Sequence, residues 1–72
     1  MKKIAININF KGTDYLSDYD EFNKEQEEEL EKLLKTAAQG KLTYIQFNSA
    51  NKLMFFPADI IKQSILSLVY RS

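Results

Sequence analysis

The chain of 72 residues contains no cysteine, no histidine and no tryptophan, and it has a single proline and two glycines. Without cysteine there can be no disulfide bond, and zinc sites built from cysteine or histidine are excluded. Nucleophilic and acid–base sites that depend on cysteine or histidine cannot be assembled either. At this length a single core leaves little stability to spare. We therefore expect one domain over residues 1–72 that is held by its apolar core or completed by a partner.

Long apolar runs are also missing. No segment approaches the roughly 18 consecutive apolar residues that a membrane-spanning helix needs. The first residues imitate the start of a signal peptide, but Asn7 and Asn9 interrupt the apolar stretch and no small-residue cleavage site follows. We therefore expect a cytoplasmic protein. Lysine, isoleucine and asparagine are frequent, and their A- and T-rich codons hint at a bacterial or phage genome.

The charges cancel in total but are segregated along the chain. Ten acidic residues balance ten basic ones. Nine of the acids lie between residues 13 and 31 beside one base, Lys24, so this segment carries −8 and the remainder carries +8. The molecule is therefore dipolar, with one concentrated acidic stretch.

The N-terminal pattern predicts a strand followed by a turn and a loop. Residues 4–10 alternate between apolar and small or polar side chains, which is typical of a half-buried strand. Residues 11–14 supply turn chemistry, with Gly12 free to adopt a positive φ. We expect residues 15–19 to form a loop.

A long helix is predicted next, with Ser17 or Asp18 as its N-cap and Gly40 just after its C-cap. Acidic residues crowd its first half and Lys32 and Lys35 lie near its end, the order that the helix dipole favours. Side chains at three- and four-residue spacing form its buried stripe: Phe22, Gln26, Leu30, Leu33, Leu34, Ala37 and Ala38.

Two β-rich runs follow, over residues 42–47 and 52–56, around a polar loop at 48–51, and they predict an antiparallel hairpin. Both runs carry large apolar side chains on both faces. A sheet of this kind needs cover on two sides, and one long helix covers only one.

The C-terminal segment has two interpretations. We prefer a short helical turn from Pro57 to Gln63 that leads into a strand over residues 64–70, because this window is rich in β-branched and aromatic residues. The alternative is a helix over residues 57–70. The predicted fold is α+β, a small single domain with the order β-α-β-β, then a short helix and a fourth strand, or β-α-β-β-α in the alternative. With a final strand, the second hairpin face must meet another chain, so we expect a homodimer or an obligate partner.

The acidic stretch is the strongest functional signal. Rows of carboxylates on a helix can compete with nucleic-acid phosphates for lysine and arginine clusters, although such a face also serves solubility alone. Two tyrosines lie just before the helix, where they offer contact area to a partner or pack over the helix entry. We assign partner contacts to Tyr15, Asp18, Tyr19, Glu25, Glu28, Glu29 and Glu31.

Other chemistry finds little support in the sequence. Asp18, Asp20 and Glu29 have the spacing of a calcium loop, but Phe22 and Asn23 occupy positions that need a ligand and a glycine. Paired carboxylates for hydrolysis would need a concave apolar site. We assign no catalytic residue, no metal site and no cofactor.

The basic and aromatic residues around the hairpin could instead stack and neutralise a nucleic acid, or the aromatics could simply be core: Lys41, Tyr44, Phe47, Lys52 and Phe55.

These observations favour a non-enzymatic protein-binding module. In a sharper form, it is a phage or mobile-element inhibitor whose acidic helix engages the basic, nucleic-acid-binding surface of a host protein. The alternatives are a structural or assembly protein that homo-oligomerises through an apolar sheet face, and a small nucleic-acid-binding domain. The acidic stretch disfavours the last because it would repel phosphate.

Overall fold

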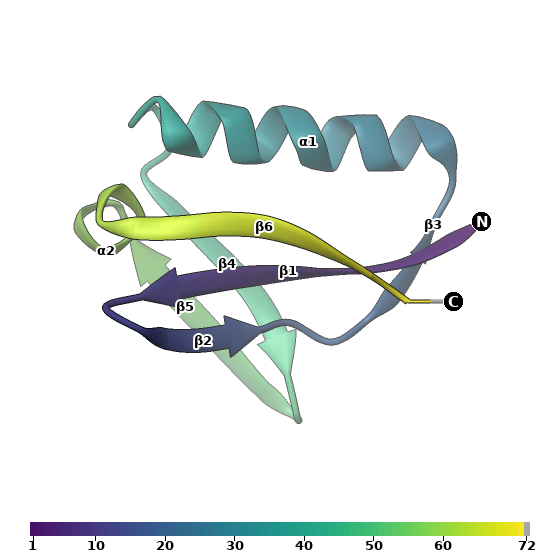
Figure 1. The fold of residues 1–72 in the computed structure, drawn as a ribbon, viewed down its shortest axis with the longest axis horizontal. Helices are drawn as coiled ribbons and strands as arrows, with labels where there is room; N and C mark the ends of the chain where they lie inside the picture. The colour runs from purple at the N-terminus through teal and green to yellow at the C-terminus, as the bar shows by residue number, and fades with distance from the viewer. Residues whose placement is uncertain (72) are drawn as a thin grey trace.

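Strand β1 (Lys2–Phe10) lies at the centre of the larger antiparallel sheet in the computed structural model, which describes residues 1–71 (Figure 1). Strand β6 (Ser64–Arg71) pairs along one edge of β1. Strands β2 (Thr13–Leu16) and β3 (Asp20–Phe22) pair one after the other along its other edge. The predicted N-terminal strand is confirmed, and the α+β class is confirmed with six strands and two helices in residues 1–71.

The loop predicted over residues 15–19 is wrong, because β2 and β3 form one strand edge that a bulge interrupts. Asn7 faces Leu16 and Ile4 faces Asp20, so residues 17–19 stand opposite only two residues of β1. Ser17 fills the bulge: its N–H donates to the Ile6 carbonyl at 2.9 Å, and its Oγ accepts from the Ile6 N–H at 2.8 Å. The side chain thus replaces the backbone acceptor that the bulge removes.

Helix α1 (Lys24–Ala38) begins later than predicted, with Asn23 as its N-cap in place of Ser17 or Asp18. Asn23 Oδ1 accepts from the Gln26 N–H at 2.8 Å, while Gln26 Oε1 accepts from the Asn23 N–H at 3.0 Å. These two amides form a capping box. Phe22, which the helical stripe included, belongs to β3 because that segment pairs with the start of β1.

The end of α1 agrees with the sequence. Gly40 has a φ of +74°, and its N–H donates to the Ala37 carbonyl at 2.9 Å. The Lys41 N–H donates to the Thr36 carbonyl at 3.1 Å, which completes a Schellman motif.

Strands β4 (Tyr44–Ser49) and β5 (Lys52–Pro57) form the predicted hairpin as a separate two-stranded sheet. Its connection is shorter than the predicted four-residue loop. Ala50 and Asn51 make a two-residue turn with φ values of 49° and 67°, the left-handed pair that matches the twist of a hairpin.

The preferred interpretation of the C-terminus is confirmed, because helix α2 (Ala58–Lys62) leads into β6. Ser64 Oγ donates to the Ile60 carbonyl at the end of α2 at 2.5 Å. The whole length of β6 then pairs with β1 from Ser64 to Arg71. This continuous pairing favours a strand over a longer helix.

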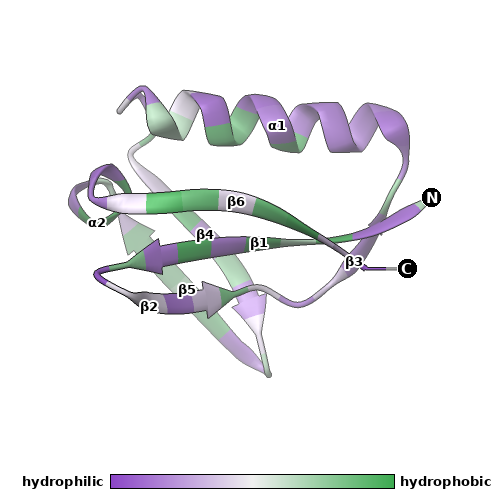
Figure 2. Ribbon diagram, viewed as in Figure 1, coloured by the Kyte–Doolittle hydropathy of each residue, from purple (hydrophilic) through white to green (hydrophobic). Residues whose placement is uncertain are grey.

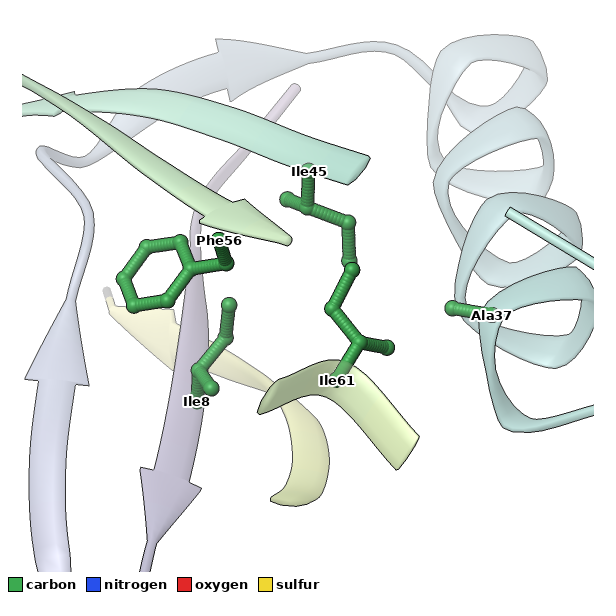
Figure 3. Packing of buried hydrophobic residues seen from close by; sticks show 5 residues of the cluster. All are labelled: Ile8, Ala37, Ile45, Phe56 and Ile61. Atoms are coloured by element: carbon green, nitrogen blue, oxygen red, sulfur yellow. The ribbon is translucent and has the colours of Figure 1, made fainter. Parts of the chain in front are cut away.

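The core lies between the larger sheet on one side and α1, α2 and the hairpin on the other (Figure 1). Figure 3 shows Ile45 and Ile61 pointing toward one another, with Ile8 beside Phe56 and Ala37 facing them from α1. These five side chains are at most 5 % exposed. Most of α1 is hydrophilic and the middle of β6 is hydrophobic (Figure 2), as expected when the helix packs by a narrow stripe.

Phe56 and Phe55 are neighbours on β5 with opposite fates, since Phe56 is 5 % exposed and Phe55 is 61 % exposed. We expect Phe56→Ala to lower the free energy of unfolding by about 3–5 kcal/mol, enough to unfold most of so small a domain. Phe55→Ala should change it by about 0.5 kcal/mol or less. Urea denaturation of both variants at low protein concentration measures the difference, and equal effects would contradict this assignment of the core.

Candidate functional site

The acidic face of α1 consists of three of the four glutamates assigned to partner contacts on this helix, Glu25, Glu28 and Glu29, whereas Glu31 follows one turn after Glu27 on another side. All four side chains are exposed. Lys32 and Lys35 follow one turn later, but within residues 1–71 no ion pair of 4.0 Å or less involves these four carboxylates. Their carboxylates are therefore open to solvent and to a partner, although Lys32 and Lys35 lie one turn from Glu28 and Glu31.

Glu27, on the same helix, has a different role. It is 9 % exposed, and its Oε2 accepts a 2.6 Å hydrogen bond from the Tyr70 hydroxyl of β6. Lys2 of β1 places its Nζ 3.4 Å from Oε1. Glu27 therefore ties the first half of α1 to both terminal strands. The residues that the sequence analysis assigned to partner contacts do not include Glu27. Its contacts with Tyr70 and Lys2 explain why this charged side chain is buried.

This contact shifts both pKa values. The Tyr70 hydrogen bond, with Lys2 contributing, lowers the pKa of Glu27 from its ordinary 4.5, although desolvation opposes the shift. The same hydrogen bond, with desolvation and the nearby carboxylate charges, raises the pKa of Tyr70 to about 12. The folded state therefore favours an ionised Glu27 carboxylate and a protonated Tyr70 hydroxyl.

The three other predicted contact residues lie along the edge formed by β2 and β3. Tyr15 is half-buried and packs edge-on against Phe56, with ring centroids 5.5 Å apart. The Tyr19 ring lies 5.2 Å from the guanidinium carbon of Arg71. Asp18 is exposed but structural contacts hold it: its N–H donates to the Asn48 carbonyl at 2.8 Å, and its Oδ1 accepts from the Ala50 N–H at 3.1 Å.

Tyr15 therefore belongs with the core, and Asp18 fixes the hairpin tip to the larger sheet. Of the seven assigned residues, the structure brings Glu25, Glu28 and Glu29 together on one side of α1, places Glu31 on the side that carries Glu27, and places the other three on the strand edge before the helix.

A second surface lies on the hairpin. The outer hairpin face consists of the side chains of β4 and β5 that alternate with the buried ones: Tyr44, Gln46, Asn48, Leu53, Phe55 and Pro57. All six are exposed. Tyr44, Leu53 and Phe55 remain 54 %, 53 % and 61 % exposed, and the rings of Tyr44 and Phe55 lie 6.4 Å apart.

The hairpin aromatics are thus divided between two environments. Phe47 packs against Phe56 with ring centroids 5.1 Å apart, so it belongs to the core. Tyr44 and Phe55 do not, and the interpretation that all of these aromatics are core is wrong for these two. Strand alternation revealed two apolar faces, but only the register with the rest of the fold decides which face is covered.

Asp14 of β2 is held by polar contacts with β1 on the larger sheet. Its Oδ1 accepts hydrogen bonds from Asn9 Nδ2 at 2.8 Å and from Asn7 Nδ2 at 3.1 Å. These two bonds lower the pKa of Asp14, and the bond from Asn7 contributes most.

In residues 1–71, acidic side chains do not gather in threes in a way that could hold a metal ion. None of the helices in that range is long and apolar enough to cross a membrane.

Comparison with known protein families, curated proteins and solved structures yields no match. What this chain binds is therefore inferred from its two surfaces.

The Glu27–Tyr70 contact predicts how stability varies with pH. Because the folded pKa of Glu27 is lowered, its contribution is complete above about pH 4.5 and is lost as the pH falls through the folded value. Because the folded pKa of Tyr70 is raised from 10.0 to about 12, its contribution is complete below pH 10 and is lost as the pH rises toward 12. We expect Tyr70→Phe to weaken both dependences.

Urea denaturation at a series of pH values measures both dependences. Near-ultraviolet absorbance of tyrosinate checks the ionisation of Tyr70 among the four tyrosines of the chain. The component that ionises near pH 12 should vanish in Tyr70→Phe and persist in the control Tyr44→Phe. Persistence of this component in Tyr70→Phe, or its loss in Tyr44→Phe, would refute the assignment.

Proposed function

We propose that this chain is a non-enzymatic protein-binding module that engages a basic protein surface through the acidic face of α1. The observation that carries the proposal is that four exposed glutamates on one helix lack ion-pair partners within residues 1–71. Like charges one turn apart weaken a helix, so this arrangement costs local stability. A surface that binds lysine and arginine side chains offsets that cost.

The spacing of the glutamates suits such a partner. Glu25, Glu28 and Glu29 are separated by three and four residues, so they share one side of α1, with neighbouring Cβ atoms about 5–6 Å apart. A basic surface that accepts such a row of carboxylates also accepts phosphates. The proposed mechanism is competition: the module occupies the site that a nucleic acid would use on its partner.

This mechanism fits the sharper form of the hypothesis, an inhibitor from a phage or a mobile element that blocks a host nucleic-acid-binding protein. Inhibition of this kind needs no catalytic group on the inhibitor. It requires complementary charge, which also speeds association.

Substitutions that remove charge but keep side-chain size test the proposal. The triple variant Glu25→Gln, Glu28→Gln, Glu29→Gln removes three charges from the acidic face without changing side-chain size. The matched control Asp20→Asn, Glu21→Gln, Asp59→Asn removes three exposed acids elsewhere. Immobilised wild-type protein should retain a nucleic-acid-binding protein from a bacterial lysate. Salt should release that protein, because exposed charges are screened beyond about 10 Å at 0.1 M salt. Added duplex DNA should also release it, because the DNA competes for the same site.

The helix variant should retain at least about tenfold less of that protein, which corresponds to about 1.4 kcal/mol, while the control should behave as wild type. Retention that is insensitive to salt, or that both triple variants weaken equally, would rule out the acidic face as the binding site.

A further inference from the structure

The outer hairpin face is a second surface without cover. Its three large side chains are each more than half exposed, whereas the opposite side of the same two strands carries Ile45 and Phe56 into the core. Contiguous exposed apolar surface on a small domain marks an interaction site. A two-stranded hairpin is also marginal alone, so cover on its second face would add to its stability.

We propose that this face binds a second copy of the chain, so that two hairpins pack face to face around a twofold axis. The lack of charge on the face suits such a contact. None of the six side chains of the face is charged, although 28 % of the chain is. In a twofold contact the groups near the axis meet their own copies, and a face without charge brings no like charges together there.

The polar groups of the face can form hydrogen bonds with their own copies. Gln46 pairs with Phe55 in the middle row of the hairpin, between the row of Tyr44 and Pro57 and that of Asn48 and Leu53. An amide both donates and accepts hydrogen bonds, as does a tyrosine hydroxyl. Gln46 can therefore bond reciprocally to Gln46 of a second copy, beside a central contact between the two Phe55 rings.

A nucleic acid or an acidic protein suits the face less well. Such a partner requires positive charge among the aromatics, but the nearest lysines in sequence, Lys41 and Lys52, lie beyond the six residues of the face. The acidic face of α1 cannot mediate the same contact, because two copies of it repel one another.

The size of the face limits the strength of the dimer. An aromatic side chain that is half exposed offers roughly 100 Å², so the six residues supply roughly 500 Å² per copy. The total of about 1,000 Å² lies at the lower bound for a specific interface. We therefore expect a weak and reversible dimer, as interfaces at the low end of the size range form.

Sedimentation velocity over a wide concentration range tests the proposal. Wild-type protein should change from monomer to dimer with rising concentration, and added salt should not dissociate the dimer. Phe55→Asp should raise the dissociation constant at least about tenfold. The control Ile65→Asp places the same charge on another exposed apolar residue, 72 % exposed on β6, and should leave association unchanged.

Both positions are exposed, so both variants should keep the wild-type circular dichroism spectrum, and Leu53→Asn gives a milder second test on the same face. In a mixture of labelled and unlabelled protein, intermolecular nuclear Overhauser effects should join the Phe55 ring to Tyr44, Leu53 or Phe55 of the other copy. A monomer at every concentration would overturn the proposal. So would association that survives Phe55→Asp, or a face whose aromatic signals shift only when oligothymidylate is added.

This test is independent of the acidic face. The triple glutamine variant should dimerise like wild type, so either proposal can fail alone.

Discussion

Hydrogen bonding along both edges of β1 is the interaction on which the rest of this structure depends. Strand β6 lies on one edge and β2 with β3 on the other, so the two ends of the chain are held side by side. Lys2 comes to lie 5.3 Å from the centre of the Tyr70 ring. Only because of this juxtaposition can Glu27 of α1 contact both residues at once, and so the position of the helix depends on the pairing of strands that are far apart in sequence.

Local signals predicted most elements, and they failed where a long-range pairing competes with them. Asp18 with Glu21 and Asn23 with Gln26 both have the spacing of a capping box, and nothing local chooses between them. The pairing of Asp20–Phe22 with β1 decides for the later one, since those residues cannot be helical and paired at once. Strands β2 and β3 were not predicted either. Their aspartates locally disfavour a strand, and only the pairing with β1, with the bulge at Ser17, makes these segments strands.

The candidate surfaces were predictable to different extents. Helical periodicity was enough to place Glu25 and Glu28 on an exposed side of α1, whereas the burial of Glu27 requires Tyr70, which lies 43 residues later in the chain. Alternation along β4 and β5 predicted two apolar faces, and the exposure of Phe55 follows only once Phe56 is seen against Ile8 and Ile61. A chain of this length buries only about 60% of the surface that its unfolded form exposes, less than a larger domain does, and here one apolar face is left over.

The two proposed surfaces differ in how salt affects their contacts, so one small domain can carry both independently. Contacts of the acidic face weaken as salt screens its charge, while burial of apolar surface does not depend on that charge. In a dimer joined by the hairpins, repulsion between the acidic faces favours arrangements that keep the two α1 helices apart. Such a dimer would present two separated rows of carboxylates to a partner, and two linked weak contacts bind more tightly than either one alone when both can be engaged together. The weak apolar interface would then matter most for partners that are themselves dimeric or that expose repeated basic sites.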